Sequence, residues 1–175
     1  MDSQFVMTII AKDRPGVVDS LSRAVADHNG NWLESRMARL GGQFAGILRA
    51  SVPAASAEKF VAALRALETA GIKINVTSDS PAAPATGQRA KLNLVGQDRP
   101  GIVRQIAQAL ARNGVNVEEL STETSSAPMT GETLFHTDAE IQIPEGGSVP
   151  QIRAEMEKIA SDLMVDIKLH ELSGS

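Results

Sequence analysis

An internal repeat constrains this sequence more than any other feature. Residues 13–18 read Asp-Arg-Pro-Gly-Val-Val, and residues 98–103, 85 positions later, read Asp-Arg-Pro-Gly-Ile-Val. At the same offset, residues of the first copy recur in the second as Ala24 and Ala109, Ala26 and Ala111, Asn31 and Asn116, and Glu34 and Glu119. A fixed period with matching residue types indicates one structural unit that was duplicated.

The first copy contains signals for six elements. An apolar run at 5–11 predicts a strand, and Val17, Leu21, Ala24, Val25 and His28 have the spacing of one helix face. Residues 32–40 and 44–52 read as strands joined by Gly41-Gly42, which can adopt the positive φ of a tight hairpin. Ser56 is expected to cap a second helix that ends at Gly71, and residues 72–76 alternate as a last strand.

The second copy repeats this order. We expect a strand at 92–96, a helix through Ile102 and Leu110, and strands at 115–123 and 134–143. The connection between these two strands, residues 125–131, is longer than Gly41-Gly42. Ser148 and Gln151 form a capping-box pattern before the second helix, and residues 165–169 alternate as the final strand.

This order of elements predicts an α+β protein of two tandem ferredoxin-like βαββαβ domains. Each has four antiparallel strands in the order 4-1-3-2, with both helices on one face. The expected boundaries are 1–79 for the first domain, 80–89 for a Pro/Ala-rich linker and 90–175 for the second domain. Because the second strand of each domain leaves an unpaired edge, we expect the two sheets to pair edge to edge.

The composition excludes several classes of function. The chain has 175 residues, no cysteine and a net charge of −4, so disulfides and thiolate metal sites are absent and direct binding to nucleic acid is not expected. Aromatic residues make up only 3%, which leaves no stacking platform for bases. No signal segment or long apolar run is present, which predicts a cytoplasmic protein without a membrane partner.

The repeated Asp-Arg-Pro-Gly segment, which we call the DRPG loop, is the candidate binding element. It lies where the first strand ends and the first helix begins, so the amides that follow Pro15 and Pro100 belong to a helix N-terminus that suits a carboxylate. Asp13 and Asp98 can accept hydrogen bonds from an ammonium group. The pattern favours a zwitterionic amino acid, and the alternative is a turn with a purely structural role.

Topology separates Asn31 and Asn116 from the DRPG loop of their own domain. The helix carries the chain back along the sheet, so each asparagine opens its strand at the opposite end. If the two edge strands pair antiparallel, Asn116 would reach the first loop and Asn31 the second, giving two composite sites. Trp32 has no aromatic counterpart at Val117, so we expect it to fill the interface.

The DRPG turn, with an Asn opening the next strand, resembles ACT domains, which are amino-acid-binding regulatory modules. The paired arrangement and the segment 31–41, Asn-Trp-Leu-Glu-Ser-Arg-Met-Ala-Arg-Leu-Gly, are similar to the family of glycine cleavage system transcriptional repressors. The resemblance implies these ligand contacts: Asp13, Pro15, Gly16, Val17, Asn31, Asp98, Pro100, Gly101, Ile102 and Asn116. Many ACT domains carry Asn where this chain has Asp13 and Asp98.

The resemblance also implies a function. Such repressors act through a DNA-bound LysR-type activator, with glycine or a similar amino acid as the ligand, and the acidic composition here agrees with regulation through a partner. An alternative is an ACT-type allosteric regulatory subunit of an amino-acid metabolic enzyme. The pattern contains no grouped nucleophile and base and no metal-ligand cluster, so we expect neither catalysis nor a cofactor. A homodimer through the outer faces is compatible with the sequence.

Overall fold

The first unit contains every predicted element. The computed structural model describes residues 1–79 and 86–172, and the chain divides into two compact units, Met1–Pro81 and Ala82–Ser175. The elements of the first unit are β1 (Asp2–Lys12), α1 (Val17–Asp27), β2 (Asn31–Leu40), β3 (Gln43–Pro53), α2 (Ala57–Ala66) and β4 (Ile72–Ser78), with 3₁₀ turns η1 (Ala54–Ser56) and η2 (Leu67–Ala70) on either side of α2.

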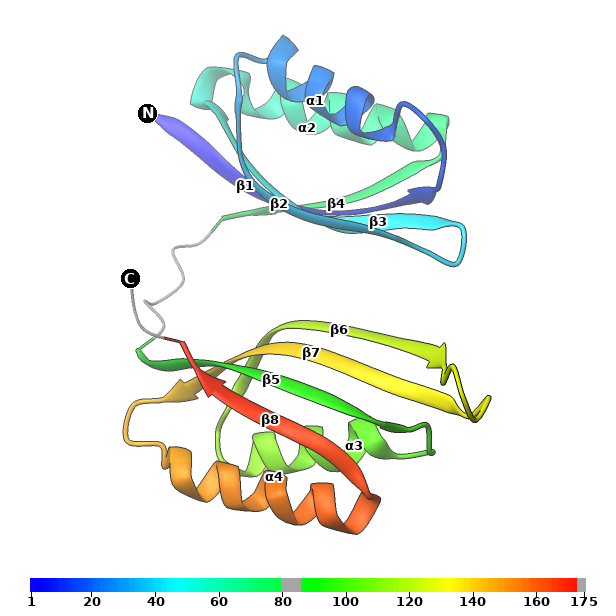
Figure 1. Ribbon diagram of the computed structural model, residues 1–175. Coiled ribbons are helices and arrows are strands. Elements are labelled where there is room, and N and C mark those ends of the chain that lie inside the picture. Colours follow the sequence, from blue (N-terminus) through cyan, green and yellow to red (C-terminus); the bar gives the residue numbers. More distant parts are fainter. Residues whose placement is uncertain (80–85, 173–175) are drawn as a thin grey trace. The chain divides into compact units, whose positions relative to one another are not determined.

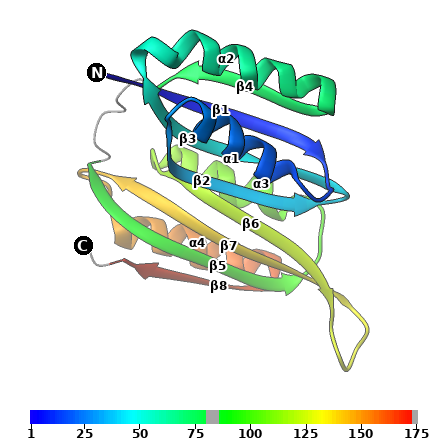
Figure 2. The ribbon, with the colours of Figure 1, turned by 90° about the horizontal axis from the view of Figure 1, so that it is seen from above.

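The second unit repeats this order without the 3₁₀ turns. Its elements are β5 (Gly87–Gln97), α3 (Ile102–Arg112), β6 (Asn116–Ser126), β7 (Thr133–Pro144), α4 (Val149–Leu163) and β8 (Val165–Glu171). The strands β6 and β7 are longer than the sequence indicated, and the turn between them extends beyond the neighbouring strands (Figure 2). Most of the predicted linker lies outside the described residues, and the residues from Gly87 onward belong to β5.

The strand order confirms the ferredoxin-like prediction. The first sheet has the order β2-β3-β1-β4 and the second β6-β7-β5-β8, and the neighbouring strands pair antiparallel. In each unit the two helices cover one face of the sheet (Figures 1 and 2). Within residues 1–79 and 86–172 the other face of each sheet carries no helix, and β2 and β6 each form one edge of their sheet.

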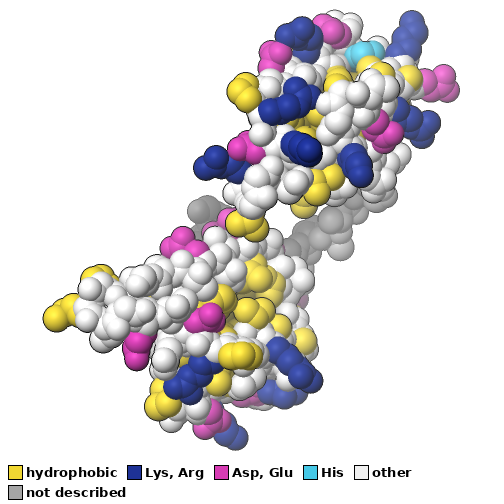
Figure 3. Space-filling model, turned by 90° about the vertical axis from the view of Figure 1, so that its right-hand side faces the viewer, with side chains coloured by type: hydrophobic (Ala, Val, Ile, Leu, Met, Phe, Trp, Pro, Cys, Tyr) yellow, Lys and Arg dark blue, Asp and Glu magenta, His cyan; other side chains and the backbone are white. Residues whose placement is uncertain are grey.

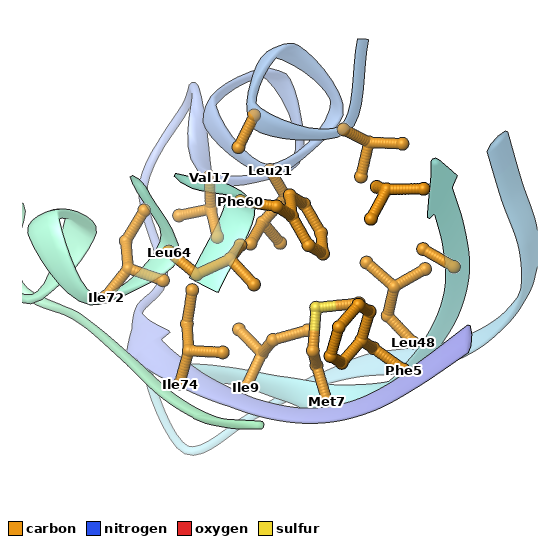
Figure 4. Packing of buried hydrophobic residues seen from close by; sticks show 14 of the residues in the cluster. Phe5, Met7, Ile9, Val17, Leu21, Leu48, Phe60, Leu64, Ile72 and Ile74 are labelled. Atoms are coloured by element: carbon orange, nitrogen blue, oxygen red, sulfur yellow. The ribbon is translucent and has the colours of Figure 1, made fainter. Parts of the chain in front are cut away.

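A separate apolar core fills the space between sheet and helices in each unit. In the first, alternate residues of β1, such as Met7 and Ile9, point toward α1 and α2 and are buried. Phe60 of α2 packs with them in the core, and the centroid of its ring lies 5.7 Å from that of the Phe5 ring (Figure 4). In the second unit Ile152 occupies the equivalent helix position and is equally buried.

The turn and capping predictions have mixed outcomes. Gly41 and Gly42 have φ of 56° and 76°, as the two-residue hairpin requires, and Gly71 has a positive φ at the end of η2. Ser148 accepts a hydrogen bond from the Gln151 amide at 3.3 Å. The prediction for Ser56 was wrong: it makes no side-chain cap hydrogen bond, because η1 already places a turn of 3₁₀ helix before α2.

Both edge strands contain an irregularity at equivalent places. The register of β2 against β3 shifts between Trp32 and Glu34, and that of β6 against β7 shifts between Val117 and Glu119. A bulge of one residue bends a strand and interrupts its row of free hydrogen-bonding groups. Both copies of the duplicated unit therefore contain this bulge, although the pattern of apolar residues in β2 and β6 did not indicate it.

Candidate functional site

The DRPG loop has the same backbone in both units. Gly16 and Gly101 are the N-cap residues of α1 and α3, and each has a φ of 94°. This left-handed conformation strains any residue with a Cβ, which accounts for glycine at both positions. An added Cβ would meet no atom within 4 Å at either glycine, so the space in front of the loop is open.

Neither helix has a side chain that caps its first amides. A glycine N-cap provides no oxygen, and no side-chain cap hydrogen bond is made at α1 or α3. The carbonyl oxygens of the two glycines accept the first helical bonds, from Ser20 and Gln105. The amides of the first turn therefore remain available at the positive end of the helix dipole, where they can bind an anionic group.

The two residues that follow the glycine in each loop differ in burial. Val17 and Ile102 are 3% and 2% exposed and anchor the helix start in the core. Their neighbours Val18 and Val103 are 48% and 45% exposed. Val17 and Ile102 thus can offer a ligand only their backbone amides, whereas Val18 and Val103 can also offer apolar side-chain surface.

The adjacent hairpin positions each aspartate. The amide of Asp13 donates to the carbonyl of Gly42 at 2.9 Å, and the amide of Asp98 donates to the carbonyl of Thr133 at 2.8 Å. These bonds fix the loop against the start of β3 or β7. Only the backbone amides of the aspartates take part in these two bonds, so neither bond uses a carboxylate.

The two carboxylates differ in their partners. The guanidinium of Arg39 lies 3.4 Å from the carboxylate of Asp13. Thr124 occupies the position of Arg39 in the second unit, and Asp98 has no side-chain partner in the part of the chain that the structure describes. Arg39 therefore lies at the candidate site, and the sequence did not indicate it, because a separation of 26 residues carries no pairing signal until the hairpin register is known.

Within one unit, the asparagines lie far from the DRPG loop. Asn31 pairs with Ser51, which pairs with Gln4 at the start of β1, whereas the loop follows Lys12 at its end. Eight residues of strand span roughly 26 Å. Asn116 lies equally far from Asp98, since its partner Gln142 pairs with Arg89. The predicted topology is confirmed, and a role of either asparagine in ligand binding stays a prediction.

Other polar residues have structural partners. His28 bonds the carbonyl of Ala24 at 2.8 Å and packs against Phe60, as expected for a structural histidine. His136 lies 2.8 Å from the hydroxyl of Ser125. Trp32 is partly buried against the core of its own unit and donates to Ser35 at 3.1 Å. Glu34 pairs with Arg36 at 2.7 Å, in line with a solvated strand carboxylate.

Neither a metal-ligand cluster nor a membrane-spanning helix occurs in the described ranges. Residues 1–79 and 86–172 contain no group of three or more His, Asp or Glu side chains that could hold a metal ion. In the same ranges no helix is both long and apolar enough to cross a membrane.

Comparison with known proteins assigns the family. Two models described as ACT domain match residues 3–77 and 91–158. UPF0237 protein MK1213 of Methanopyrus kandleri is 32% identical over 79 residues, which cover 45% of this chain and 82% of that protein.

Two solved structures span almost the whole chain. An unknown protein from Galdieria sulphuraria has a TM-score of 0.87 and 32% identity, covering 99% of this chain and 100% of that one. A candidate glycine cleavage system transcriptional repressor has a TM-score of 0.71 and 20% identity, covering 99% of both, which shows a shared fold. With a model matched to each repeat, the chain belongs to the ACT-domain family and carries two ACT domains in tandem.

Proposed function

We propose that this protein is a non-catalytic amino-acid sensor whose DRPG loops bind the ligand. The observation that carries the proposal is the duplicated loop, in which an uncapped helix start opens beside an aspartate in both units. A ligand carboxylate would accept from the amides at Gly16, Val17 and Val18, or at Gly101, Ile102 and Val103. The ligand ammonium would donate to Asp13 or Asp98. A small amino acid such as glycine satisfies both ends.

A sensor needs an output, and we infer that this output is a partner protein. The fold is shared with a candidate glycine cleavage system transcriptional repressor, and the net charge of −4 disfavours direct binding to DNA. A LysR-type activator is the partner that the sequence resemblance favours. The ligand would act by favouring one conformation of the sensor, and so one form of the surface that the partner meets.

The second candidate is a regulatory subunit of an amino-acid metabolic enzyme. The same loops would bind the ligand, and only the partner would differ. Recovery of the protein from cells with its associated proteins separates the two candidates. A DNA-binding regulator among them supports the first, and a biosynthetic enzyme supports the second.

Removing both aspartates is expected to weaken the binding of amino acids. Calorimetric titration of the full chain with glycine, serine and the other common amino acids identifies the ligand. In the Asp13→Ala, Asp98→Ala double variant the affinity is expected to fall by about 10-fold or more, because a hydrogen bond to a charged group contributes roughly 1.5–3 kcal/mol. Asp162→Ala, an exposed position on α4, is the matched control. Unchanged binding by the double variant would refute the site.

Freeing Asp13 from its arginine is expected to strengthen the first site. The Arg39 guanidinium competes with a ligand ammonium for the carboxylate, and an exposed pair of this kind contributes about 0.2–1 kcal/mol. Arg39→Ala in an Asp98→Ala background should therefore tighten binding up to about 5-fold by calorimetry. The reciprocal change, Thr124→Arg in an Asp13→Ala background, should weaken the second site. Movement of either affinity in the opposite direction would show that the pair does not compete with the ligand.

A further inference from the structure

Three cations line a hollow beside the first DRPG loop, where the end of β1 meets the end of η2 and the start of β4. The hollow has a volume of about 410 Å³. Its lining comprises Ile10, Ala11, Lys12, Arg14, Gln43, Ala70, Gly71 and Lys73. Three of these side chains are positively charged and none is negatively charged.

The strand register explains how the cations come together. Inward-facing Ile9 and Ala11 are buried, so Ile10 and Lys12 face the side of the sheet that carries no helix. Lys73 of β4 pairs with Ile10, and Gln43 of β3 pairs with Lys12. Paired residues face the same side, so both lysines project from the same face at one end of the sheet. Figure 3 views this end and shows Lys and Arg side chains gathered on the first unit.

The cations are not neutralised by the protein. The ammonium groups of Lys12 and Lys73 have neither a hydrogen bond nor an ion pair among residues 1–79 and 86–172. Arg14 donates to the carbonyl of Ala70 at 2.6 Å, which holds its guanidinium at the rim between the loop and η2. A guanidinium has five N–H donors, so most of them remain for a ligand.

The second unit provides an internal control for this cluster. The position of Lys12 is held there by Gln97, two residues after Val95, and that of Lys73 by Asp166, which pairs with Val95. Leu134 replaces Gln43. Only Arg99 retains its charge, and it lies 3.4 Å from the side-chain oxygen of Gln97. The fold alone therefore does not require cations here.

We propose that this hollow, the basic hollow of the first unit, binds the phosphate group of a small phosphorylated molecule. A phosphate monoester carries a charge of about −1.5 to −2 at pH 7 and three acceptor oxygens, which suits two ammonium groups and one guanidinium better than a single carboxylate does. An adjoining hollow of about 550 Å³ shares Ile10 and Lys73 and adds Thr8, Asn75 and Glu68. Those polar side chains can bond the hydroxyl groups of an organic part.

The site is independent of the amino-acid site at the same loop. The amino acid would use the amides of α1 and the Asp13 carboxylate, whereas the phosphate would use the side chains of Lys12, Arg14 and Lys73. Failure of one proposal therefore leaves the other standing, and titrations with the two kinds of ligand distinguish them.

Titration of the full chain with inorganic pyrophosphate and with glycerol 3-phosphate tests the proposal. Amide chemical shifts at Lys12, Gly71 and Lys73 are expected to move, and raising the salt from about 10 to 150 mM should weaken binding because it screens exposed charges. Lys12→Gln with Lys73→Asp, the residues of the second unit, should weaken binding about 10-fold or more at low salt. Lys59→Gln on α2, outside both hollows, should leave it unchanged.

The reciprocal variant tests sufficiency. Gln97→Lys with Asp166→Lys is expected to create shifts at the equivalent positions of the second unit. All of these residues are exposed, and an unaltered unfolding midpoint would show that the fold is retained. Equal losses for Lys59→Gln and the double variant would overturn the proposal. So would binding to vesicles of phosphatidylglycerol without binding to either soluble phosphate, because the ligand would then be a membrane surface.

Discussion

Replacing Phe60 by alanine is expected to lower the free energy of unfolding of the first unit by about 3–5 kcal/mol. The Phe60 side chain is fully buried and packs against the rings of Phe5 and His28, at 5.7 and 5.8 Å. Its removal leaves a cavity between α2 and the sheet that these neighbours fill only in part. Because native domains are stabilised by about 5–15 kcal/mol, a change of this size removes much of the margin.

Denaturation in urea, followed by the fluorescence of Trp32, measures this effect. Trp32 is the only tryptophan and packs against the first core, so its signal reports the first unit. Ile152→Ala removes the equivalent side chain of α4 and should leave the Trp32 transition in place while lowering the stability of the second unit. An unchanged Trp32 transition in Phe60→Ala would contradict the assigned core.

Replacing Gly46 by threonine is expected to cost about 2–3 kcal/mol of stability. An added Cβ would overlap the carbonyl oxygen of Arg36 and lie 2.6 Å from the Cα of Met37 on the neighbouring strand. The equivalent pair in the second unit is Thr137 with Thr122, so threonine is compatible with the ladder when the opposite side chain is small. Part of the cost is therefore assigned to Met37, whose Cγ also lies 2.6 Å away.

A double-mutant cycle separates these contributions. Met37→Thr in the Gly46→Thr background should recover part of the lost stability in urea denaturation, because it reproduces the pair of the second unit. Strictly additive losses would show that only the contacts with the backbone of Arg36 and Met37 matter.

Much of the fold could be predicted because its signals are local. The repeat fixed the number of units, Gly41-Gly42 fixed the first hairpin, and the alternation in each strand fixed its inward face. The opposite placement of Asn31 and the DRPG loop followed from topology alone and agrees with the register. The Ser56 cap failed because a local rule could not foresee that η1 precedes the helix.

The parts of the site that could not be predicted depend on register. Three contacts at the loop join residues whose separation along the chain matches neither the helix period nor the strand period. They are the ion pair of Asp13 with Arg39, the bond from the Asp13 amide to Gly42 and the bond from Arg14 to Ala70. The cluster of Lys12 with Lys73 likewise requires the pairing of β1 with β4. The bulges at Leu33 and Glu118 leave no trace in a pattern of apolar and polar residues.

The unequal surroundings of Asp13 and Asp98 bear on the dose response of the proposed sensor. Two identical sites would fill over the same narrow interval of ligand concentration. In the proposed sensor, one carboxylate engaged by an arginine and one without a side-chain partner among the described residues would give sites of different strength, and an exposed ion pair worth about 0.2–1 kcal/mol would separate their half-saturation points by up to about fivefold. The exchange at one strand position, Arg39 against Thr124, would then widen the range of ligand concentration over which the proposed sensor responds.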